Sequence, residues 1–414
     1  MSESARFYIA LALLVVSLVL RHGLLFLISL VLLLALAVAW FWGRHCLERV
    51  EYRRYFRPSR AFFGEEVELT VEVVNRKLLP MAWLQVEDEI PSALAPVKGA
   101  VAESHKQERS LLLNLLSLSW YERVRRRYRI RCDTRGYHTF GPARLRSGDI
   151  FGFHIRELDV PDQDSLLVYP RVVPIAQLGL PSQDPFGDIK IRQWIFEDPL
   201  RSVGVREYAY GDSLRRIHWK ATARTQKLQA KVYEPSTTYR LVILLNLHTY
   251  GRSWWWLGYD SHLLELAVSV AASVANWAAE RGYQVGLSAN GNVRGSDQRI
   301  KISASRNPEQ LTHILEALAK AQPFAAFPLE ALLDLESREL PYGVTLVIVT
   351  SVLTEESLAG LMAVRAAGHR VALLLIGDEA PDFSHPGLTV YRIGGQARWR
   401  EMEEIAARAP AGVR

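Results

Sequence analysis

The chain has 414 residues, of which 49% are hydrophobic and 23% are charged, so two or three folded domains are expected and disordered or low-complexity classes are excluded. Its two cysteines, Cys46 and Cys132, lie far apart, which excludes a disulfide scaffold and a cysteine-based zinc site and is typical of a reducing compartment. The formal charge is +6, and residues 1–238 hold 34 of the 50 Lys and Arg residues but 26 of the 44 Asp and Glu residues, which favours an anionic surface or partner near that half.

Two apolar runs near the N-terminus predict a hairpin of membrane-spanning helices. The runs are residues 7–20 and 24–42, with residues 21–23 between them. The second run would be about 28 Å long as a helix, which matches a hydrocarbon core of about 30 Å. The first run is short, and it can be extended if Arg6 and Arg21 snorkel to the interface. A signal peptide followed by one anchor is the alternative, but no small-x-small cleavage site follows the first run.

The charges around these runs predict their orientation. Six arginines follow the second run: Arg44, Arg49, Arg53, Arg54, Arg57 and Arg60. The turn between the runs holds only Arg21 and His22. The positive-inside rule therefore places the N-terminus and the large C-terminal part in the cytoplasm. We interpret the arginine cluster as a topology signal in contact with lipid headgroups.

The region from Gly64 to Tyr169 carries the alternating pattern of half-buried strands. Val67, Leu69, Val71 and Val73 alternate with polar residues. More strands are predicted at residues 83–91, 109–120 and 126–132, before a stretch with regularly placed glycines. Short strands at this spacing predict a small β-sandwich. A linker rich in Pro and Gly follows it.

The most distinctive segment is REYAYGDSLRRIHWKATARTQKLQAKVYEP, residues 206–235. From Arg206 to Lys231 it holds seven basic and two acidic residues. The triplet Gly211-Asp212-Ser213 predicts a helix start, with Asp212 or Ser213 as N-cap. One face of this helix would carry Leu214, Ile217 and Ala221, and another would carry Arg216, Lys220 and Arg224.

Two interpretations of this segment stay open. Like charges on one helix face repel each other slightly, so acidic groups or an external anion should lie near them. The segment is then either an internal clasp between the soluble domains, with Asp212 as an acidic member, or a site for an anion or a partner. His218 is expected to pack and hydrogen-bond rather than to catalyse. The candidate residues are Arg206, Asp212, Arg215, Arg216, His218, Trp219, Lys220 and Arg224.

From Tyr239 the chain alternates predicted strands and helices. Near-continuous apolar runs predict buried parallel strands. The predicted strands are residues 240–247, 283–290, 344–351 and 369–377, with an edge strand at 388–393. The predicted helices are residues 261–282, 308–321 and 355–368. This pattern is typical of an α/β domain with helices on both faces of a mostly parallel sheet and a ligand site at the strand C-terminal ends.

The apolar hairpin, the β-rich middle and the pattern R-x-Y-x-x-G-D-x-x-R-x-I-x-W-K-x-x-A-R together resemble the domain-of-unknown-function 58 family. The pattern is carried by Arg206, Tyr208, Gly211, Asp212, Arg215, Ile217, Trp219, Lys220, Ala223 and Arg224. The resemblance implies a membrane-anchored bacterial protein with a von Willebrand factor A-like domain. It also implies association with MoxR-type AAA+ ATPases and with transglutaminase-like proteins, and hence a role in the assembly or maturation of other proteins.

The chain departs from the metal site that this family's fold can carry, which is built from Asp-x-Ser-x-Ser after the first strand. Here the equivalent positions are Asn246, Thr249, Thr350 and Ser351, which supply no charge, whereas Mg²⁺ prefers carboxylate oxygens. We therefore expect no metal and no cofactor. The same loop holds Trp254, Trp255 and Trp256, which either pack on the domain or form an exposed aromatic anchor for a partner.

The sequence predicts a multidomain α+β protein: two transmembrane helices at 1–43, a juxtamembrane segment and β-sandwich at 44–170, a linker and basic segment at 171–238, and a von Willebrand factor A-like α/β domain at 239–414. It has no P-loop, no His-Glu-x-x-His and no Gly-x-Ser-x-Gly motif, and no nucleic-acid module. We expect a non-enzymatic scaffold or adaptor of the bacterial inner membrane, with cytoplasmic soluble domains, that binds a MoxR-type ATPase or its client. The alternative is an enzyme with an unrecognised site around Asp212, His218 and Lys220.

Overall fold

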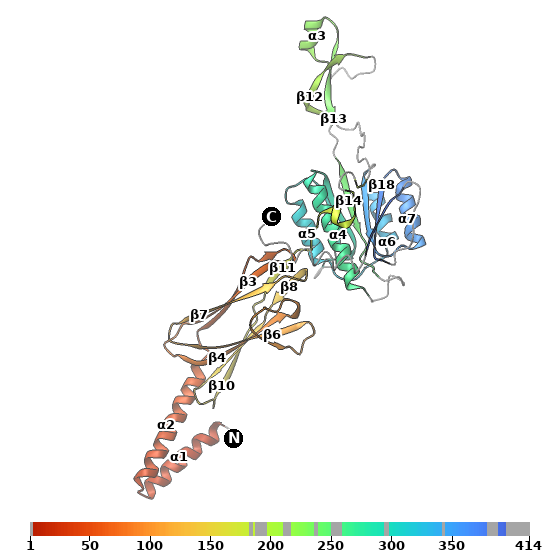
Figure 1. Cartoon of the computed structure of the whole chain (residues 1–414). Coiled ribbons are helices and arrows are strands. Elements are labelled where there is room, and N and C mark those ends of the chain that lie inside the picture. The colour runs from red at the N-terminus through yellow and green to blue at the C-terminus, as the bar shows by residue number, and fades with distance from the viewer. Residues whose placement is uncertain are drawn as a thin grey trace. The chain divides into compact units, whose positions relative to one another are not determined.

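The structure is a computed structural model of the chain (Figure 1). It describes residues 3–181, 185–186, 197–209, 217–235, 239–249, 259–293, 298–341, 344–378 and 388–394. The chain divides into two compact units, Met1–Tyr169 and Pro170–Arg414. The first unit holds two helices and a β body, and the second holds a hairpin and an α/β body.

Two apolar helices near the N-terminus confirm the predicted helical pair: α1 (Glu3–Val19) and α2 (Gly23–His45). The hydroxyl oxygens of Ser17 and Ser29 lie 3.4 Å apart between them. α2 is long and apolar enough to cross a membrane, and only 11% of its apolar window is buried. α4 (Ser261–Glu280) meets the same criteria, but 72% of its window is buried, which is the environment of a core helix in a soluble domain.

The connection from α2 to the first strand is short and fixed by hydrogen bonds. β1 (Val50–Arg57) follows α2 after a turn that includes Cys46 and Leu47, two members of the core of the β body. The ammonium of Lys77 donates to the carbonyl oxygens of Cys46 and Glu48, the second at 2.8 Å. α2 and β1 therefore form one continuous packed element.

The β body consists of three sheets, with the strand orders β1-β3-β7, β10-β9-β4-β6-β5 and β2-β11-β8. Beyond β1, its strands are β2 (Arg60–Ala61), β3 (Glu66–Asn75), β4 (Met81–Pro91), β5 (Ala100–Glu103), β6 (Arg109–Leu118), β7 (Arg123–Arg131), β8 (Gly136–Phe140), β9 (Ala143–Gly148), β10 (Ile155–Val160) and β11 (Asp164–Val168). The predicted strands of this region are confirmed as β3, β4, β6 and β7. The glycine-rich stretch after them forms β8, β9 and the turn before β10.

One apolar core joins these sheets. Leu69 and Val71 of β3, Leu84 and Val86 of β4, and Phe140 of β8 all lie in it and are almost fully buried. Alternation along β3 directs its apolar residues into this core, because successive side chains of a strand point to opposite faces. Sheets that share one core in this way have the architecture of a sandwich.

The second unit contains a six-stranded sheet with the order β16-β15-β14-β17-β18-β19. Its strands are β14 (Arg240–Leu245), β15 (Gln284–Asn292), β16 (Arg299–Ser305), β17 (Thr345–Thr350), β18 (Arg370–Ile376) and β19 (Thr389–Ile393). Neighbouring strands pair in parallel, except that β16 is antiparallel to β15. The predicted mostly parallel sheet is confirmed, and β16 is an additional strand.

The helices of the α/β body lie on both faces of the sheet, as predicted. Besides α4 they are α5 (Gln310–Lys320), α6 (Leu329–Glu339) and α7 (Glu355–Ala366). Val242 and Leu244 of β14 share a buried cluster with Leu332 of α6 and Leu361 of α7, so α6 and α7 cover one face. α4 contacts β14, β15 and α5, and covers the other. α6 was not predicted, because its sequence is more polar than those of α4, α5 and α7.

Candidate functional site

The basic segment forms a β-hairpin that carries a short helix. β12 (Glu197–Glu207) pairs antiparallel with β13 (Gln229–Pro235), with Arg206 opposite Ala230. α3 (Trp219–Thr225) lies between these strands in the sequence and at the end of the hairpin in Figure 1. The described residues 197–209 and 217–235 are termed the basic hairpin. Part of the predicted linker is therefore a paired structure.

Residues 211–213, the predicted helix start, lie outside the described residues, and the helix that the structure describes in this segment, α3, begins at Trp219. Ile217 is buried and forms a β-bridge with Ala230, so it does not share a helix face with Ala221. His218 is the N-cap instead, and its Nδ1 accepts a hydrogen bond from the backbone N–H of Ala221 at 3.0 Å. A long-range strand pairing thus fixes where this helix begins.

The surface of α3 is aromatic and basic. Trp219 is 70% exposed, and Lys220 and Arg224 are exposed four residues apart on the same helix face. Within the residues that the structure describes, neither Lys220 nor Arg224 forms an ion pair. Lys227 pairs with Glu207 at 3.4 Å, but this pair is exposed and contributes at most about 1 kcal/mol. The face around Trp219 therefore keeps a positive charge.

Five of the candidate residues lie in the basic hairpin: Arg206, His218, Trp219, Lys220 and Arg224. Arg206 donates through Nη1 to the carbonyl oxygen of Glu207 at 3.1 Å. The other candidates lie outside the described residues: Asp212, Arg215, Arg216, Trp254, Trp255 and Trp256. The clasp around Asp212 and the role of the tryptophan loop therefore stay predictions.

A second polar cluster lies at the carboxyl ends of β14, β15 and β17, the edge where parallel sheets commonly bind ligands. The side chains of Asn246, Asn290 and Thr350 are buried there. Asn290 Nδ2 donates to Asn246 Oδ1 at 2.7 Å, and Asn246 Nδ2 donates to Thr350 Oγ1 at 2.9 Å. Asn290 Oδ1 accepts the backbone N–H of Leu247 at 2.8 Å. The amides of this cluster therefore bond to one another and to the backbone.

This cluster carries no charge. Thr249 Oγ1 accepts the backbone N–H of Asp260 at 2.9 Å, while the carboxylate of Asp260 caps α4 by accepting the N–H groups of His262 and Leu263. Ser351 donates to the carbonyl oxygen of His248 at 3.3 Å. In the described ranges, no three His, Cys, Asp or Glu residues gather. The hydrogen bonds hold the strand ends together, and the side chains offer no carboxylate to a hard cation.

Two members of this cluster were not singled out from the sequence. Asn290 lies two residues before the end of β15, and an amide at the end of an apolar run is a signal that could have located it. His248 follows β14 and is half-buried. Burial lowers the pKa of His248, and the charge of Glu330 opposes this effect.

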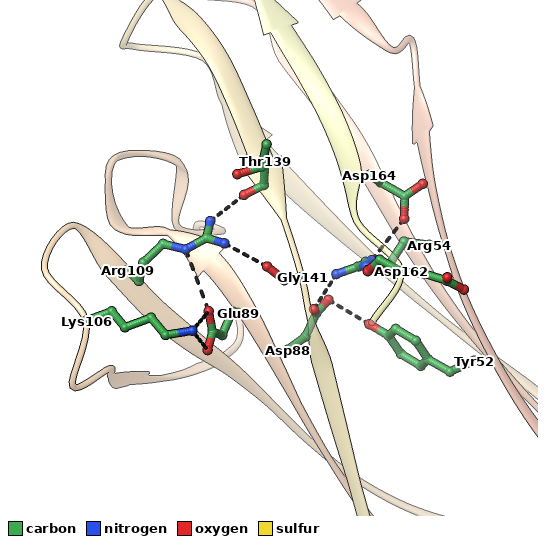
Figure 2. A network of polar contacts seen from close by, with 10 residues as sticks. All are labelled: Tyr52, Arg54, Asp88, Glu89, Lys106, Arg109, Thr139, Gly141, Asp162 and Asp164. Carbon is green, nitrogen blue, oxygen red and sulfur yellow. Dashed lines mark hydrogen bonds and ion pairs between the residues drawn. The ribbon is translucent and has the colours of Figure 1, made fainter. Parts of the chain in front are cut away.

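The β body contains a buried ionic network that the sequence did not reveal (Figure 2). The side chains of Arg54 and Asp88 are 1% and 0% exposed, and Arg54 Nη1 donates to Asp88 Oδ1 at 2.6 Å. Arg54 also donates to Asp164 Oδ2 at 3.1 Å and to the carbonyl oxygen of Asp162. The hydroxyl of Tyr52 donates to Asp88 Oδ2 at 2.6 Å. The interpretation of Arg54 as a headgroup-facing residue is therefore wrong.

Burial dominates the electrostatics of this network. It raises the pKa of Asp88 to about 6, although Arg54 and Tyr52 favour the ionised carboxyl. Burial, together with the adjacent Asp88, raises the pKa of Tyr52 well above its usual value. Gly141 has a φ of +95°, and a Cβ at this position would collide with the guanidinium of Arg54. The site of the Arg54 guanidinium therefore requires a glycine at position 141.

A neighbouring group in Figure 2 joins other strands and turns. Lys106 Nζ lies 2.7 Å from Glu89 Oε1, and Arg109 donates to the carbonyl oxygens of Gly141, at 2.7 Å, and Thr139. Each of these contacts links segments of the β body that are distant in the sequence. We assign the whole network a structural role.

Residues 204–393 match the family described as Protein of unknown function DUF58. This region includes most of the basic hairpin and the six-stranded sheet. The chain is also similar to a protein of Bacillus subtilis (strain 168) described as "Uncharacterized protein YeaD", with 25% identity over 351 residues that cover 82% of this chain and 78% of that protein. The family match confirms the predicted resemblance over residues 204–393, and neither description assigns an activity.

Two solved structures each resemble 29% of this chain. The CARDB domain of a Pyrococcus furiosus protein is 13% identical, with 89% of that chain covered and a TM-score of 0.19. A non-cellulosomal cohesin from Archaeoglobus fulgidus is 10% identical, with 91% of that chain covered and a TM-score of 0.20. At TM-scores this low, the two similarities support no conclusion about the function of this protein.

Proposed function

We propose that the protein is a membrane-anchored, non-enzymatic scaffold and that the face of α3 around Trp219 binds an acidic surface of a protein partner. The partner class that the family resemblance implies is a MoxR-type AAA+ ATPase or a client of that ATPase. The exposed Trp219, flanked by the exposed Lys220 and Arg224, is the observation that carries the proposal.

An exposed tryptophan beside exposed cations is characteristic of a binding surface. Trp and Arg are enriched among the residues that dominate binding energy. The cations Lys220 and Arg224 would steer an acidic partner and fix its register. Val205 and Leu228 of the same hairpin are also 47% exposed each.

The membrane and the α/β body are further parts of the proposal. α2 supports anchoring, because it is apolar over the thickness of a bilayer and ends in Arg44 and His45. The positive-inside rule supports a cytoplasmic location of both units. The strand order, with one antiparallel strand at an edge, supports a von Willebrand factor A-like domain. The uncharged cluster around Asn246 supports a function of this domain without a metal.

An enzyme centred on Asp212, His218 and Lys220 is not favoured by the geometry. The Nδ1 of His218 accepts the hydrogen bond that caps α3, so this nitrogen is engaged in the fold. Lys220 is exposed, whereas the reactive lysines of enzymes are commonly desolvated to lower their pKa.

Binding of the full-length protein to the MoxR-type ATPase of the same bacterium tests the proposal. The protein is reconstituted in lipid nanodiscs, and affinity is measured by surface plasmon resonance at two salt concentrations. We expect Trp219→Ala to weaken binding by about 2 kcal/mol, roughly thirtyfold, as for a hot-spot residue. Lys220→Gln should slow association and reduce its salt dependence.

Lys98→Gln is the matched control, because it removes the same charge from an exposed position in the β body. Its affinity should equal that of the unmodified protein. Wild-type protein that fails to bind, or Trp219→Ala that binds as well as wild type, would refute the assignment of this surface. Turnover of a substrate by the purified protein alone would refute the non-enzymatic role.

A further inference from the structure

The turn between β9 and β10 displays apolar side chains on the outside of the β body. Ile150, Phe151, Phe153 and Ile155 are 60%, 57%, 41% and 55% exposed. The rings of Phe151 and Phe153 stack with their centroids 5.8 Å apart. Four large apolar residues within six positions form a patch of the kind that marks an interaction surface.

The turn is built to hold these side chains outward. The carboxylate of Asp149 is buried and accepts the backbone N–H groups of Phe151 at 2.9 Å and His154 at 2.5 Å. The backbone of Asp149 also closes the turn, because its N–H donates to the carbonyl oxygen of His154 and its carbonyl oxygen accepts the N–H of Gly152. Gly152 has a φ of +73°, a conformation that favours glycine. The apolar display therefore belongs to a well-bonded conformation of the chain.

Contacts with the helices place this turn at the end of the apolar helical pair. The side chain of His154 lies against Gly43, where a Cβ would collide with it, so the turn packs on the last turns of α2. The guanidinium of Arg6, near the start of α1, lies 5.4 Å from the ring centroid of Phe153. In Figure 1, β10 runs beside the end of α2 that meets the β body.

A cavity of about 590 Å³ lies between the turn and both helices, and its walls include His154, Arg6, Leu36 and Trp40. Leu36 is seven residues before Gly43, which is about 10 Å along a helix. The cavity therefore extends from the turn into the apolar part of α2. Trp40, which is half exposed, has the amphipathic character of residues at membrane interfaces.

From this geometry we propose that residues 150–155 form a third membrane contact, immersed where lipid headgroups meet acyl chains. The inference rests on the proposed anchoring of α1 and α2. It adds that the β body touches the bilayer through its own apolar turn and is held at a fixed height and orientation. The occupant of the patch is lipid, because the turn packs on the end of the apolar helix α2 and shares a cavity with apolar residues of both helices.

Site-directed fluorescence on the full-length protein tests this contact. Single cysteines replace Ile150 or Phe151, and each is labelled with an environment-sensitive fluorophore in vesicles of phosphatidylcholine and phosphatidylglycerol. The native cysteines are fully buried and do not compete for the label. We expect strong quenching by lipids that carry a nitroxide at the headgroup or upper acyl chain, and a several-fold smaller quenching by aqueous iodide than at an exposed site. The expected depth is about 5–10 Å, as for other interfacial segments.

Two control positions separate this inference from the proposed anchoring. Leu32→Cys lies on the exposed surface of α2 and reports whether the helix is in lipid. Phe62→Cys lies beyond β1, whose eight residues span about 26 Å, and it should be quenched by iodide alone.

The inference is overturned if the labels at Ile150 and Phe151 respond as the label at Phe62 does while the label at Leu32 lies in lipid, and the anchoring then stands. Protection of the turn from both quenchers would mean that protein covers it, which also overturns the inference. Quenching of the Leu32 label by iodide would contradict both the proposed anchoring and the proposed membrane contact of the turn.

Discussion

Replacing Arg54 by Met should destabilise the β body strongly, because the change leaves the carboxylate of Asp88 buried without its cationic partner. Asp88 is fully buried, and its contacts with a charge or hydroxyl come from Arg54 and Tyr52. Removal of one partner from a buried ion pair costs about 3–5 kcal/mol. Because each 1.4 kcal/mol is a factor of ten, amide protection in β1 and β4 should fall by about a hundredfold to a few thousandfold.

The loss of stability caused by Arg54→Met should decrease as the pH falls. Burial raises the pKa of Asp88 to about 6, against a usual value of 3.8, and Arg54 opposes the rise. Without Arg54, the pKa of Asp88 in the folded state rises further. Between that pKa and 3.8, the folded variant holds a proton that the unfolded chain lacks, so its free energy of unfolding increases on acidification. The variant should therefore recover more stability than wild type between about pH 8 and about pH 5.

Hydrogen–deuterium exchange of the full-length protein, read by mass spectrometry and corrected for the intrinsic rate at each pH, measures both effects. Arg53→Met is the matched control on the same strand. Its side chain is 59% exposed, and its ion pair with Glu51 is 3.4 Å long, so its loss should cost at most about 1 kcal/mol. Equal losses of protection for the two variants, or a loss at Arg54 that grows as the pH falls, would contradict the reasoning.

Two more predictions concern the α/β body. Asn290→Ala should lower the free energy of unfolding by at least about 2 kcal/mol, since the amide of Asn246, the N–H of Leu247 and the carbonyl of Phe327 lose buried hydrogen bonds. Urea unfolding measures this loss of stability. The control Asn276→Ala removes an exposed hydrogen bond and should cost far less. Millimolar Mg²⁺ or Mn²⁺ should leave the melting temperature unchanged, because the cluster offers no carboxylate, and stabilisation above about 1 kcal/mol would contradict this.

Elements with a strong local pattern were predictable from the sequence. The alternation in β3 and the apolar runs of β14, β17 and β18 predicted strands that the structure contains. β16 was missed because RIKISAS is more polar than these runs, and it forms at the edge of the sheet by pairing with β15. The local signal for such an edge strand is weak, and the partner strand decides its structure.

The site residues show the same limit. The predicted helix face joined Ile217 to Ala221, but Ile217 forms a β-bridge with Ala230, and α3 begins at Trp219. Arg54 looked like one of several equivalent arginines, yet its partner Asp88 is 34 residues away and only the folding of the strands brings them together. Local spacing cannot reveal such contacts, because they depend on which strands become neighbours.

The short turn between α2 and β1 makes their connection a stiff joint rather than a flexible linker. Lys77 ties the backbone of this turn to the β body, so no slack chain can uncoil when the β body is pulled. A force on the β body would therefore reach α2 as torque, and the helix would tilt with its load.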